Sequence, residues 1–403
     1  MSKRVIIPLG PQHPALKEPE SFTLYLEGER VAASNVTLGY NHRGIEKACE
    51  ERSYIQCLYL LERVCGICSH SHTTAFITAA EEVAQLEIPK RAKYIRTLIG
   101  ELERVHSHLL WVGVAAHEIG FDTLFMYSWR DREVVMDILA MLTGNRVQYS
   151  INTLGGVRRD VSDSQKEEIL KAIDILEERT KYYIDVVTTE TTMMGRLKNV
   201  GGLTHEIATK LNALGPLARA SGVDRDIRRD DPYLVYDEIP FNVITNDGCD
   251  VFGRVVVRAL ELIESYRIIR YVVKNMPDGD LTVKAPRKLP ANEATVRYEA
   301  PRGEDLHYVR GNGTEKPERV KLRAPTMANL ASISYMLDGG YLADVPIVIA
   351  AIDPCFSCTD RAISIKQIDS GREGTLEWNN LRTYSIEWYK NHGFDAHKIK
   401  LSR

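Results

Sequence analysis

The stretch Arg63-Val64-Cys65-Gly66-Ile67-Cys68-Ser69-His70-Ser71-His72 decides the fold, because its cysteine pair has a counterpart near the other end of the chain. That counterpart is Asp353-Pro354-Cys355-Phe356-Ser357-Cys358. Thiolates bind soft or borderline metals, and two intervening residues let both sulfurs of a pair face one ion across a turn. Since 286 residues lie between Cys68 and Cys355, the pairs can share an ion only where the two ends of the chain meet in a buried core. The spacing alone leaves a structural zinc ion and a redox metal equally open.

The composition is that of a protein with a large core. The 403 residues are 44% apolar and 27% charged, which excludes a disordered chain, a collagen and a small disulfide scaffold. This length corresponds to roughly two to three domains, or to one large core with insertions.

The charge balance and the apolar runs limit the partners and the compartment. With 52 basic against 55 acidic residues, no charge excess favours nucleic acid or an anionic membrane. The apolar run 5–9 is too short for the core of a signal peptide, and no other apolar stretch reaches spanning length. We therefore expect a cytosolic or peripheral protein whose cysteines stay reduced.

Hydrophobic periodicity predicts a mainly helical protein with minor β structure. The alternation from Glu20 to Thr37 predicts a hairpin with Phe22, Leu24 and Leu26 on one face. Helical spacing of apolar residues predicts seven helices, at about 73–89, 91–118, 131–142, 164–194, 204–219, 250–274 and 326–337. The apolar run 346–350 predicts a strand that leads into the second cysteine pair. Clustered prolines and glycines with short β-like runs predict a small β-containing insertion at 276–325.

The residues that flank the cysteines favour the redox metal. Both pairs resemble the R-x-C-G-x-C-x-x-x-H and D-P-C-x-x-C signatures of the large subunits of nickel-iron hydrogenases. Further matching segments extend the resemblance over most of the chain: Arg43-Gly44-Ile45-Glu46, Gly155-Gly156-Val157-Arg158, Ala300-Pro301-Arg302-Gly303 and Ala324-Pro325-Thr326. The opening Gly10-Pro11-Gln12-His13-Pro14-Ala15 is similar to the membrane-associated, energy-converting branch, and the quinone-site subunit of respiratory complex I shares it. That related subunit lacks the four cysteines, so their presence here favours hydrogen chemistry.

The resemblance implies a fold and a domain organisation. We expect a mainly α fold with minor β structure (α+β), in which a central bundle of long helices carries an N-terminal β region at about 1–40 and the β insertion at 276–325. Residues 1–361 then form the domain typical of hydrogenase large subunits, and residues 362–403 form a C-terminal extension. In this family a maturation protease often removes such an extension once nickel is inserted, which predicts cleavage after Arg361. The alternative is a retained tail that docks on a neighbouring subunit.

The resemblance also implies a cofactor. All four sulfurs then bind a NiFe(CN)2CO centre, with Cys65 and Cys355 terminal on nickel and Cys68 and Cys358 bridging to iron. Four thiolates supply the charge and the softness that hold nickel in several redox states. The implied reaction is reversible heterolytic cleavage of H2, with Cys355 as the first proton acceptor.

Five further residues occupy positions with a role in the family. Glu18 matches the glutamate that takes the proton from the cysteine, although a bare sequence favours a solvated loop carboxylate there. Arg302 matches the arginine over the open metal face, and Pro325 and Thr326 match the segment that hydrogen-bonds a cyanide ligand. His72 matches a histidine that bonds a bridging sulfur, although a buried packing histidine would look the same.

One departure puts a second metal in doubt. Many relatives end their second motif in a histidine that helps bind magnesium or iron, whereas this chain has Arg361. Glu46 would be another ligand of that site, and we expect Glu46 to pair with Arg361 instead.

The expected partners follow from the branch. Cys49, Cys57 and Cys249 are too few and too scattered to hold an iron-sulfur cluster in this chain, so electrons must leave through an iron-sulfur small subunit to a ferredoxin or a similar carrier. The branch adds membrane ion-translocating subunits and a peripheral place on the cytoplasmic face of the cell membrane. The alternatives are a sulfur-reducing relative without hydrogenase activity and a complex I-like scaffold with structural zinc.

Overall fold

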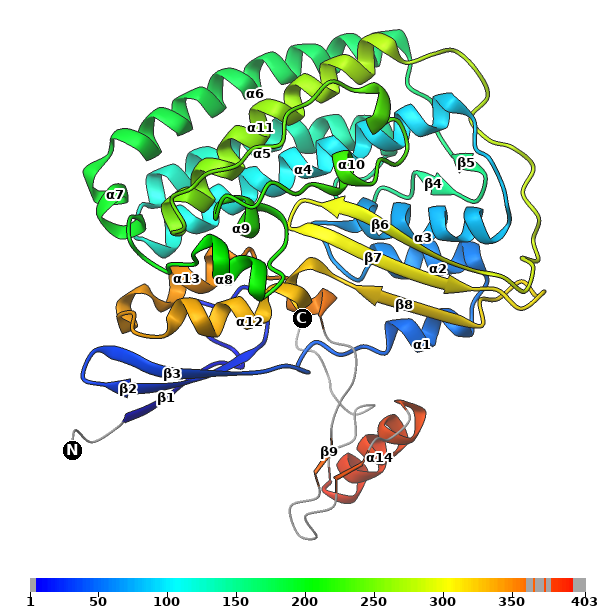
Figure 1. Ribbon diagram of the computed structural model, residues 1–403. Helices are drawn as coiled ribbons and strands as arrows, with labels where there is room; N and C mark the ends of the chain where they lie inside the picture. Colours follow the sequence, from blue (N-terminus) through cyan, green and yellow to red (C-terminus); the bar gives the residue numbers. More distant parts are fainter. Residues whose placement is uncertain (1–4, 360–364, 367–372, 375–377, 394–403) are drawn as a thin grey trace.

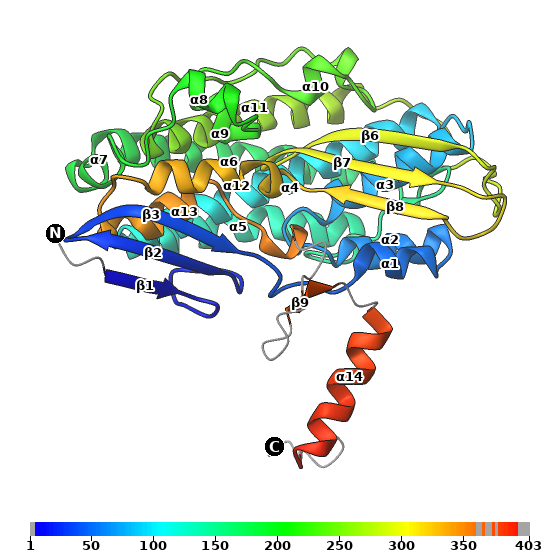
Figure 2. The ribbon, with the colours of Figure 1, turned by 60° about the horizontal axis from the view of Figure 1, so that its bottom comes forward.

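The computed structural model describes residues 5–359, 365–366, 373–374 and 378–393. A bundle of long helices carries two three-stranded antiparallel sheets along one side (Figures 1 and 2). This arrangement confirms the predicted α+β class. None of the described helices combines the length and the apolar content that crossing a bilayer requires.

Four long helices pack against one another as the bundle: α4 (Lys90–Glu118), α5 (Asp122–Thr143), α6 (Asp163–Thr189) and α11 (Val251–Asn275). The predicted stripe of α4 is fully buried at Ile95, Leu98 and Val105, and each such side chain contributes roughly 1.5–3 kcal/mol. Helix α6 begins with a capping box, in which Ser162 accepts the amide of Gln165. The predicted helices at 91–118 and 250–274 are confirmed, and the one at 164–194 ends at Thr189, before the short α7 (Thr191–Leu197).

The N-terminal sheet has the order β1-β2-β3, from β1 (Val5–Leu9), β2 (Ser21–Glu27) and β3 (Arg30–Thr37). The predicted hairpin is β2–β3, and Phe22, Leu24 and Leu26 point into the core as their alternation requires. Strand β1 pairs with β2 in antiparallel register and was not expected as a strand. The segment that joins β1 and β2 carries Glu18.

The predicted insertion contains the second sheet, of order β6-β7-β8, from β6 (Glu293–Ala300), β7 (Gly303–Arg310) and β8 (Arg319–Arg323). This sheet packs on α3 (Ser69–Val83), which follows the first cysteine pair. The tight β6–β7 turn carries Arg302, and a Cβ added at Gly215 would lie 2.4 Å from the carbonyl oxygen of Arg302. Glycine at this position therefore lets α9 (Gly215–Arg219) approach the turn.

Two predicted elements are wrong. The run 346–350 lies in a helix, α13 (Val345–Ala351), with Pro346 at its start, and not in a strand. A short apolar run fits a buried helix as well as a strand, and this one packs against α4 in the core. The predicted helix at 204–219 is two short helices, α8 (His205–Lys210) and α9, because the backbone turns left-handed at Asn212 and Gly215.

The remaining boundaries differ in detail. Helix α3 begins four residues before the predicted start, α5 begins nine residues early, and α12 (Pro325–Leu337) is as expected. Further short elements were not expected as such: α1 (Ile45–Glu50), α2 (Tyr54–Glu62), α10 (Ile227–Asp230), α14 (Trp378–Asn391), β4 (Asn152–Thr153), β5 (Gly156–Val157), β9 (Ile365–Lys366) and β10 (Glu373–Gly374).

Candidate metal centre

The first cysteine pair lies in the loop between α2 and α3. Cys68 is the N-cap residue of α3, and Cys65 accepts the amide of Ile67 at 3.3 Å. This hydrogen bond holds the Cys65 sulfur against the turn that precedes α3.

The second pair follows α13. Asp353 has a left-handed backbone, and Cys355 then opens a single 3-10 turn, Phe356–Cys358. The amide of Cys355 donates to the Thr326 hydroxyl at 3.0 Å. Thr326 and Pro325 form the first turn of α12, so this helix fixes the start of the motif.

The two pairs meet in the core. The sulfur of Cys355 lies 3.3 Å from that of Cys65 and 2.8 Å from that of Cys358, and the sulfurs of Cys68 and Cys358 are 4.0 Å apart. All four side chains are 2–3% exposed. Four soft donors at this spacing, shielded from water, fit the coordination shell of nickel, iron or zinc.

Arg302 lies beside the sulfurs and is fixed by Asp353. Its Nε and Nη2 donate to the carbonyl and carboxylate oxygens of Asp353 at 2.7 and 2.8 Å. Although burial opposes the charge, Asp353 and the sulfurs of Cys65 and Cys355 hold the pKa of Arg302 well above its usual value. Its Nη1 has no partner within the described part of the chain, so this cation is available to a small molecule.

Glu18 also lies close to Cys355. One carboxylate oxygen is 3.9 Å from the sulfur, and the carboxylate accepts both the amide and the hydroxyl of Ser357 at 2.9 Å. Burial, followed by the negative charge of Cys65, raises the pKa of Glu18. A cavity of about 140 Å³ is lined by Glu18, Arg302 and Cys355 together with apolar residues of α4. The solvated loop carboxylate that a bare sequence suggests is therefore not what the structure shows.

His72 lies on the first turns of α3 with its Nε2 3.3 Å from the sulfur of Cys358. Its Nδ1 is 3.0 Å from a carboxylate oxygen of Asp305 and 3.1 Å from Nε2 of His307. Sequence reasoning missed Asp305 and His307. The signal was present, because two polar residues two apart on a strand share one face, and this face of β7 is buried.

Three side chains of α4 hold the site segments in place, and none of them was predicted. Glu103 accepts the amides of His70 and Ser71 at 2.6 and 3.0 Å, and Arg104 donates to the Glu299 carbonyl at 2.6 Å. The indole of Trp111 donates to the Ala350 carbonyl at 2.7 Å. Burial raises the pKa of Glu103 to about 7.

Other predicted positions lie outside this centre. Cys57 donates to the carbonyl of Cys49 at 3.3 Å, and these two and Cys249 join no group of potential metal ligands within the described residues. Glu46 accepts Lys321 at 3.0 Å and the Leu322 amide at 2.9 Å. Its expected partner Arg361 lies outside the described residues.

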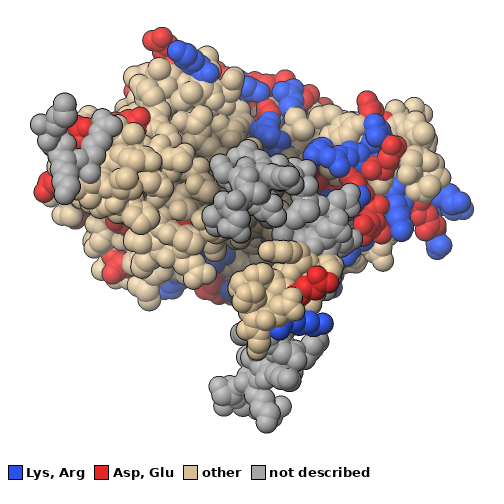
Figure 3. Space-filling model, turned by 90° about the horizontal axis from the view of Figure 1, so that it is seen from below, with Lys and Arg blue, Asp and Glu red and all other residues tan. Residues whose placement is uncertain are grey.

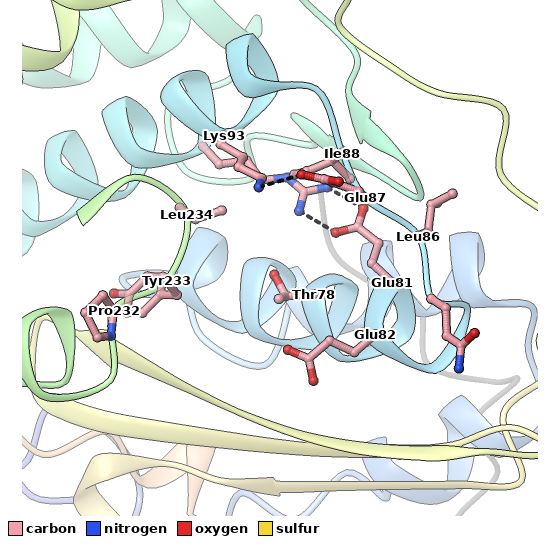
Figure 4. A pocket seen from close by; sticks show the side chains of 12 residues that line it. Thr78, Glu81, Glu82, Leu86, Glu87, Ile88, Lys93, Pro232, Tyr233 and Leu234 are labelled. Carbon is pink, nitrogen blue, oxygen red and sulfur yellow. Dashed lines mark hydrogen bonds and ion pairs between the residues drawn. The ribbon is translucent and has the colours of Figure 1, made fainter. Parts of the chain in front are cut away.

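A larger cavity of about 480 Å³ lies between the end of α3, the start of α4 and residues 232–234 (Figure 4). Thr78 and Glu82 of α3 and Tyr233 of the loop line it, and one wall is the ion pair of Glu81 with Arg96. No predicted site residue lines this cavity.

Comparison with known proteins assigns the chain to a family. The family described as "Respiratory-chain NADH dehydrogenase, 49 Kd subunit" matches residues 118–292 and 282–361, and the family described as "Nickel-dependent hydrogenase" matches residues 43–113. The chain is 43% identical to the membrane-bound hydrogenase subunit alpha of Pyrococcus furiosus, over 95% of this chain and 93% of that protein. It is 37% identical to formate hydrogenlyase subunit 5 of Escherichia coli, over 96% of this chain and 68% of that protein.

Relatives with other names match as well. The chain is 36% identical to a subunit of the NADH-quinone oxidoreductase of Rhizobium etli, over 89% of this chain and 96% of that protein. A chain of the membrane-bound sulfane sulfur reductase, an archaeal respiratory membrane complex, superposes with a TM-score of 0.85 and 32% identity, over 89% of this chain and 98% of that chain. The chain therefore belongs to the oxidoreductase family that unites the large subunits of nickel-dependent hydrogenases with the 49 kDa subunit of the respiratory-chain NADH dehydrogenase.

Proposed function

We propose that this chain is the catalytic subunit of a membrane-associated nickel-iron hydrogenase. One observation carries the proposal: the four cysteine sulfurs converge beside a fixed arginine and a half-buried glutamate. A structural zinc site needs only the sulfurs, whereas a cation and a proton acceptor around one cavity suit a reaction.

The proposed cofactor is a NiFe(CN)2CO centre. Cys65, Cys68, Cys355 and Cys358 would hold this group, Cys65 and Cys355 as terminal ligands of nickel and Cys68 and Cys358 as ligands shared with iron. When bound, this centre supplies the polarisation that splits H2 and accepts the two electrons. Pro325 and Thr326 would contact the cyanide ligands, since the Thr326 oxygen accepts the Cys355 amide and its hydroxyl hydrogen remains available to donate.

The residues of the chain handle the protons. Cys355 takes the first proton on its sulfur and passes it to Glu18. Ser357 holds the Glu18 carboxylate by hydrogen bonds, and one carboxylate oxygen lies 3.9 Å from the Cys355 sulfur. The raised pKa of Glu18 favours proton uptake from a thiol. Arg302, held by Asp353, keeps a positive charge over the cavity, where it orients H2 and stabilises the charge separation. In the reverse direction the same groups deliver two protons to be reduced.

The electrons leave through a partner, and we propose an iron-sulfur small subunit that exchanges them with a ferredoxin or a similar carrier. Helix α5 carries the exposed side chains Met126, Tyr127 and Trp129. Helix α5 packs closely on α4 here, since a Cβ added at Gly113 of α4 would lie 2.5 Å from Trp129. The residue after Gly113, Val114, lines the Glu18 cavity. Exposed aromatic side chains on a helix next to α4, which lines the Glu18 cavity, are a suitable docking place for that subunit.

We also propose membrane ion-translocating subunits and a peripheral place on the cytoplasmic face. Seen from below, charged side chains gather over α1 and β8, whereas the side of β1–β3 and α12 is mostly uncharged (Figure 3). Exposed apolar side chains on β1 and α12 include Val5, Ile6, Met327 and Tyr335. This distribution supports a protein interface there.

Residues 1–361 are the proposed catalytic domain, and a maturation protease removes residues 362–403. Magnesium beside Glu46 is not part of the proposal, because Arg361 stands where many relatives have the histidine that helps bind it.

Metal analysis and activity of the purified complex test the proposal. We expect one nickel and iron per chain, infrared bands of carbon monoxide and cyanide on iron, and H2 evolution from reduced viologen. Zinc alone on the cysteines would contradict the hydrogenase and favour the scaffold.

A second candidate is a sulfur reductase, which the likeness to the sulfane sulfur reductase chain favours. In that case the complex would contain nickel and iron but would reduce polysulfide and evolve no H2. Assays of H2 evolution and of polysulfide reduction, both with the same electron donor, distinguish the two functions.

A further inference from the structure

Strand β7 places a carboxylate and an imidazole against the first cysteine motif. Asp305 and His307 are two apart on β7, so both point to the face that packs on α3, where His72 lies. Asp305 and His307 are 0% exposed and His72 is 1% exposed. A polar group this deeply buried must be satisfied by its neighbours.

The three side chains meet at one carboxylate oxygen of Asp305. One carboxylate oxygen of Asp305, Oδ2, lies 3.0 Å from Nδ1 of His72 and 3.0 Å from Nε2 of His307, and the two nitrogens are 3.1 Å apart. His307 thereby holds the carboxylate, and the carboxylate holds His72.

The far side of the His72 ring faces the metal centre. Its Nε2 is 3.3 Å from the sulfur of Cys358. An imidazole ring can turn over, and a half turn would place a carbon against Cys358 and lose the bond to Asp305. The carboxylate therefore selects the orientation in which Nε2 faces the sulfur, and a ring that carries hydrogen on both nitrogens donates Nδ1–H to Asp305 and Nε2–H to the sulfur of Cys358.

We propose that Asp305 is a positioning residue, which acts through His72 to keep a hydrogen bond on the sulfur of Cys358. This inference rests on the proposed function and deepens it. Hydrogen bonds to ligand sulfurs draw electron density from the metal and shift its reduction potential. Asp305 therefore tunes the centre without contacting it.

The test compares Asp305→Ala and Asp305→Asn with wild type in the purified complex. Asp131→Ala is the matched control. Asp131 lies on α5 and is also buried, but it accepts a hydrogen bond from the hydroxyl of Tyr183 on α6. The readouts are the infrared carbonyl band on iron, the metal content, H2 evolution and the structure of the variant complex.

In Asp305→Ala we expect nickel to be retained, the carbonyl band to move to lower frequency, and H2 evolution to fall about tenfold or more. Asparagine keeps an oxygen acceptor, so its effects are smaller, and the control leaves the band unchanged. In the structure of Asp305→Ala, the His72 ring turns and no nitrogen remains within about 4 Å of the Cys358 sulfur.

Two results would overturn the inference. The first is an unchanged band together with an unturned His72 ring in both Asp305 variants. The second is an additional metal ion per chain that Asp305→Ala loses, since the three atoms would then be ligands of a cation. A wild-type complex without nickel would instead reject the proposed function, while the orientation of the His72 ring would still decide the role of Asp305.

Discussion

The carboxylate of Glu18 lies 3.9 Å from the sulfur of Cys355, although the two residues are 337 positions apart in the chain. The β1–β2 connection brings Glu18 to the second cysteine motif, and Ser357, two residues after Cys355, receives it with two hydrogen bonds. The second motif thus holds in place the glutamate that we propose as its proton acceptor.

Replacing Glu18 with Gln keeps the size of the side chain and removes its proton affinity. We expect H2 evolution to fall about 10²-fold or more with nickel retained. Glu62→Gln is the control, because the Glu62 carboxylate likewise accepts the amide and the hydroxyl of one serine, Ser150. Equal losses in both variants would show that Glu18 acts only in folding.

Replacing any of the four centre cysteines with Ser removes a soft donor. We expect the nickel content to fall at least about tenfold in each variant. Cys57→Ser should keep its nickel, since Cys57 only donates to the Cys49 carbonyl and a hydroxyl can do the same. Full nickel in Cys68→Ser would place the metal elsewhere.

Arg302→Lys keeps the positive charge and loses the two-point bond to Asp353. We expect H2 evolution to fall about 10²-fold at unchanged nickel content, because the cation no longer has a fixed place over the cavity. Lys321→Arg at an exposed ion pair is the control. Undiminished turnover in Arg302→Lys would show that charge alone suffices.

Glu103 predicts a pH dependence of stability. Burial raises its pKa from 4.5 to about 7 in the folded chain. Between these values the folded chain holds a proton that the unfolded chain has lost, so stability is greatest below about 4.5 and falls as the pH rises through about 7. Glu103→Gln should flatten this decline in a pH series of thermal unfolding. A parallel decline in both proteins would contradict the assignment.

Removal of residues 362–403 would change the mass of the subunit. If a protease matures the chain, the subunit purified from the assembled complex lacks the 42 residues after Arg361. Intact-mass spectrometry reads this directly, and the variant Cys65→Ser, which cannot bind nickel as proposed, should keep its tail. A full-length mass in the active complex would show a retained docking element.

The long helices and the residues of the cysteine site could be predicted, for different physical reasons. An apolar stripe such as Ile95, Leu98 and Val105 repeats with the helical period, so α4 follows from the sequence. The two C-x-x-C spacings predict a shared metal site directly from the sequence. Glu18 has no such pattern, and only resemblance distinguished it from a surface glutamate.

Tertiary contacts determined the rest. Glu103 and Arg104 are charged residues on a long amphipathic helix, which predicts a solvated face, yet both are buried because backbone amides and carbonyls of the site receive them. Asp305 and His307 lie in a segment with the composition of a peripheral insertion, and only the packing of β7 on α3 reveals them. The run 346–350 lacks a period, so its length could not separate helix from strand.

Glu103, Arg104 and Trp111 all lie on α4, and each hydrogen-bonds a different, distant part of the chain. The eight positions from Glu103 to Trp111 correspond to about 12 Å along the helix. The distances between the first cysteine motif, the β6–β7 turn that carries Arg302 and the second cysteine motif therefore depend on the rise per residue of α4. Inserting or deleting one residue between Glu103 and Trp111 would rotate one anchor by about 100° relative to the others, so this short interval of the helix should tolerate changes of side chain far better than changes of length.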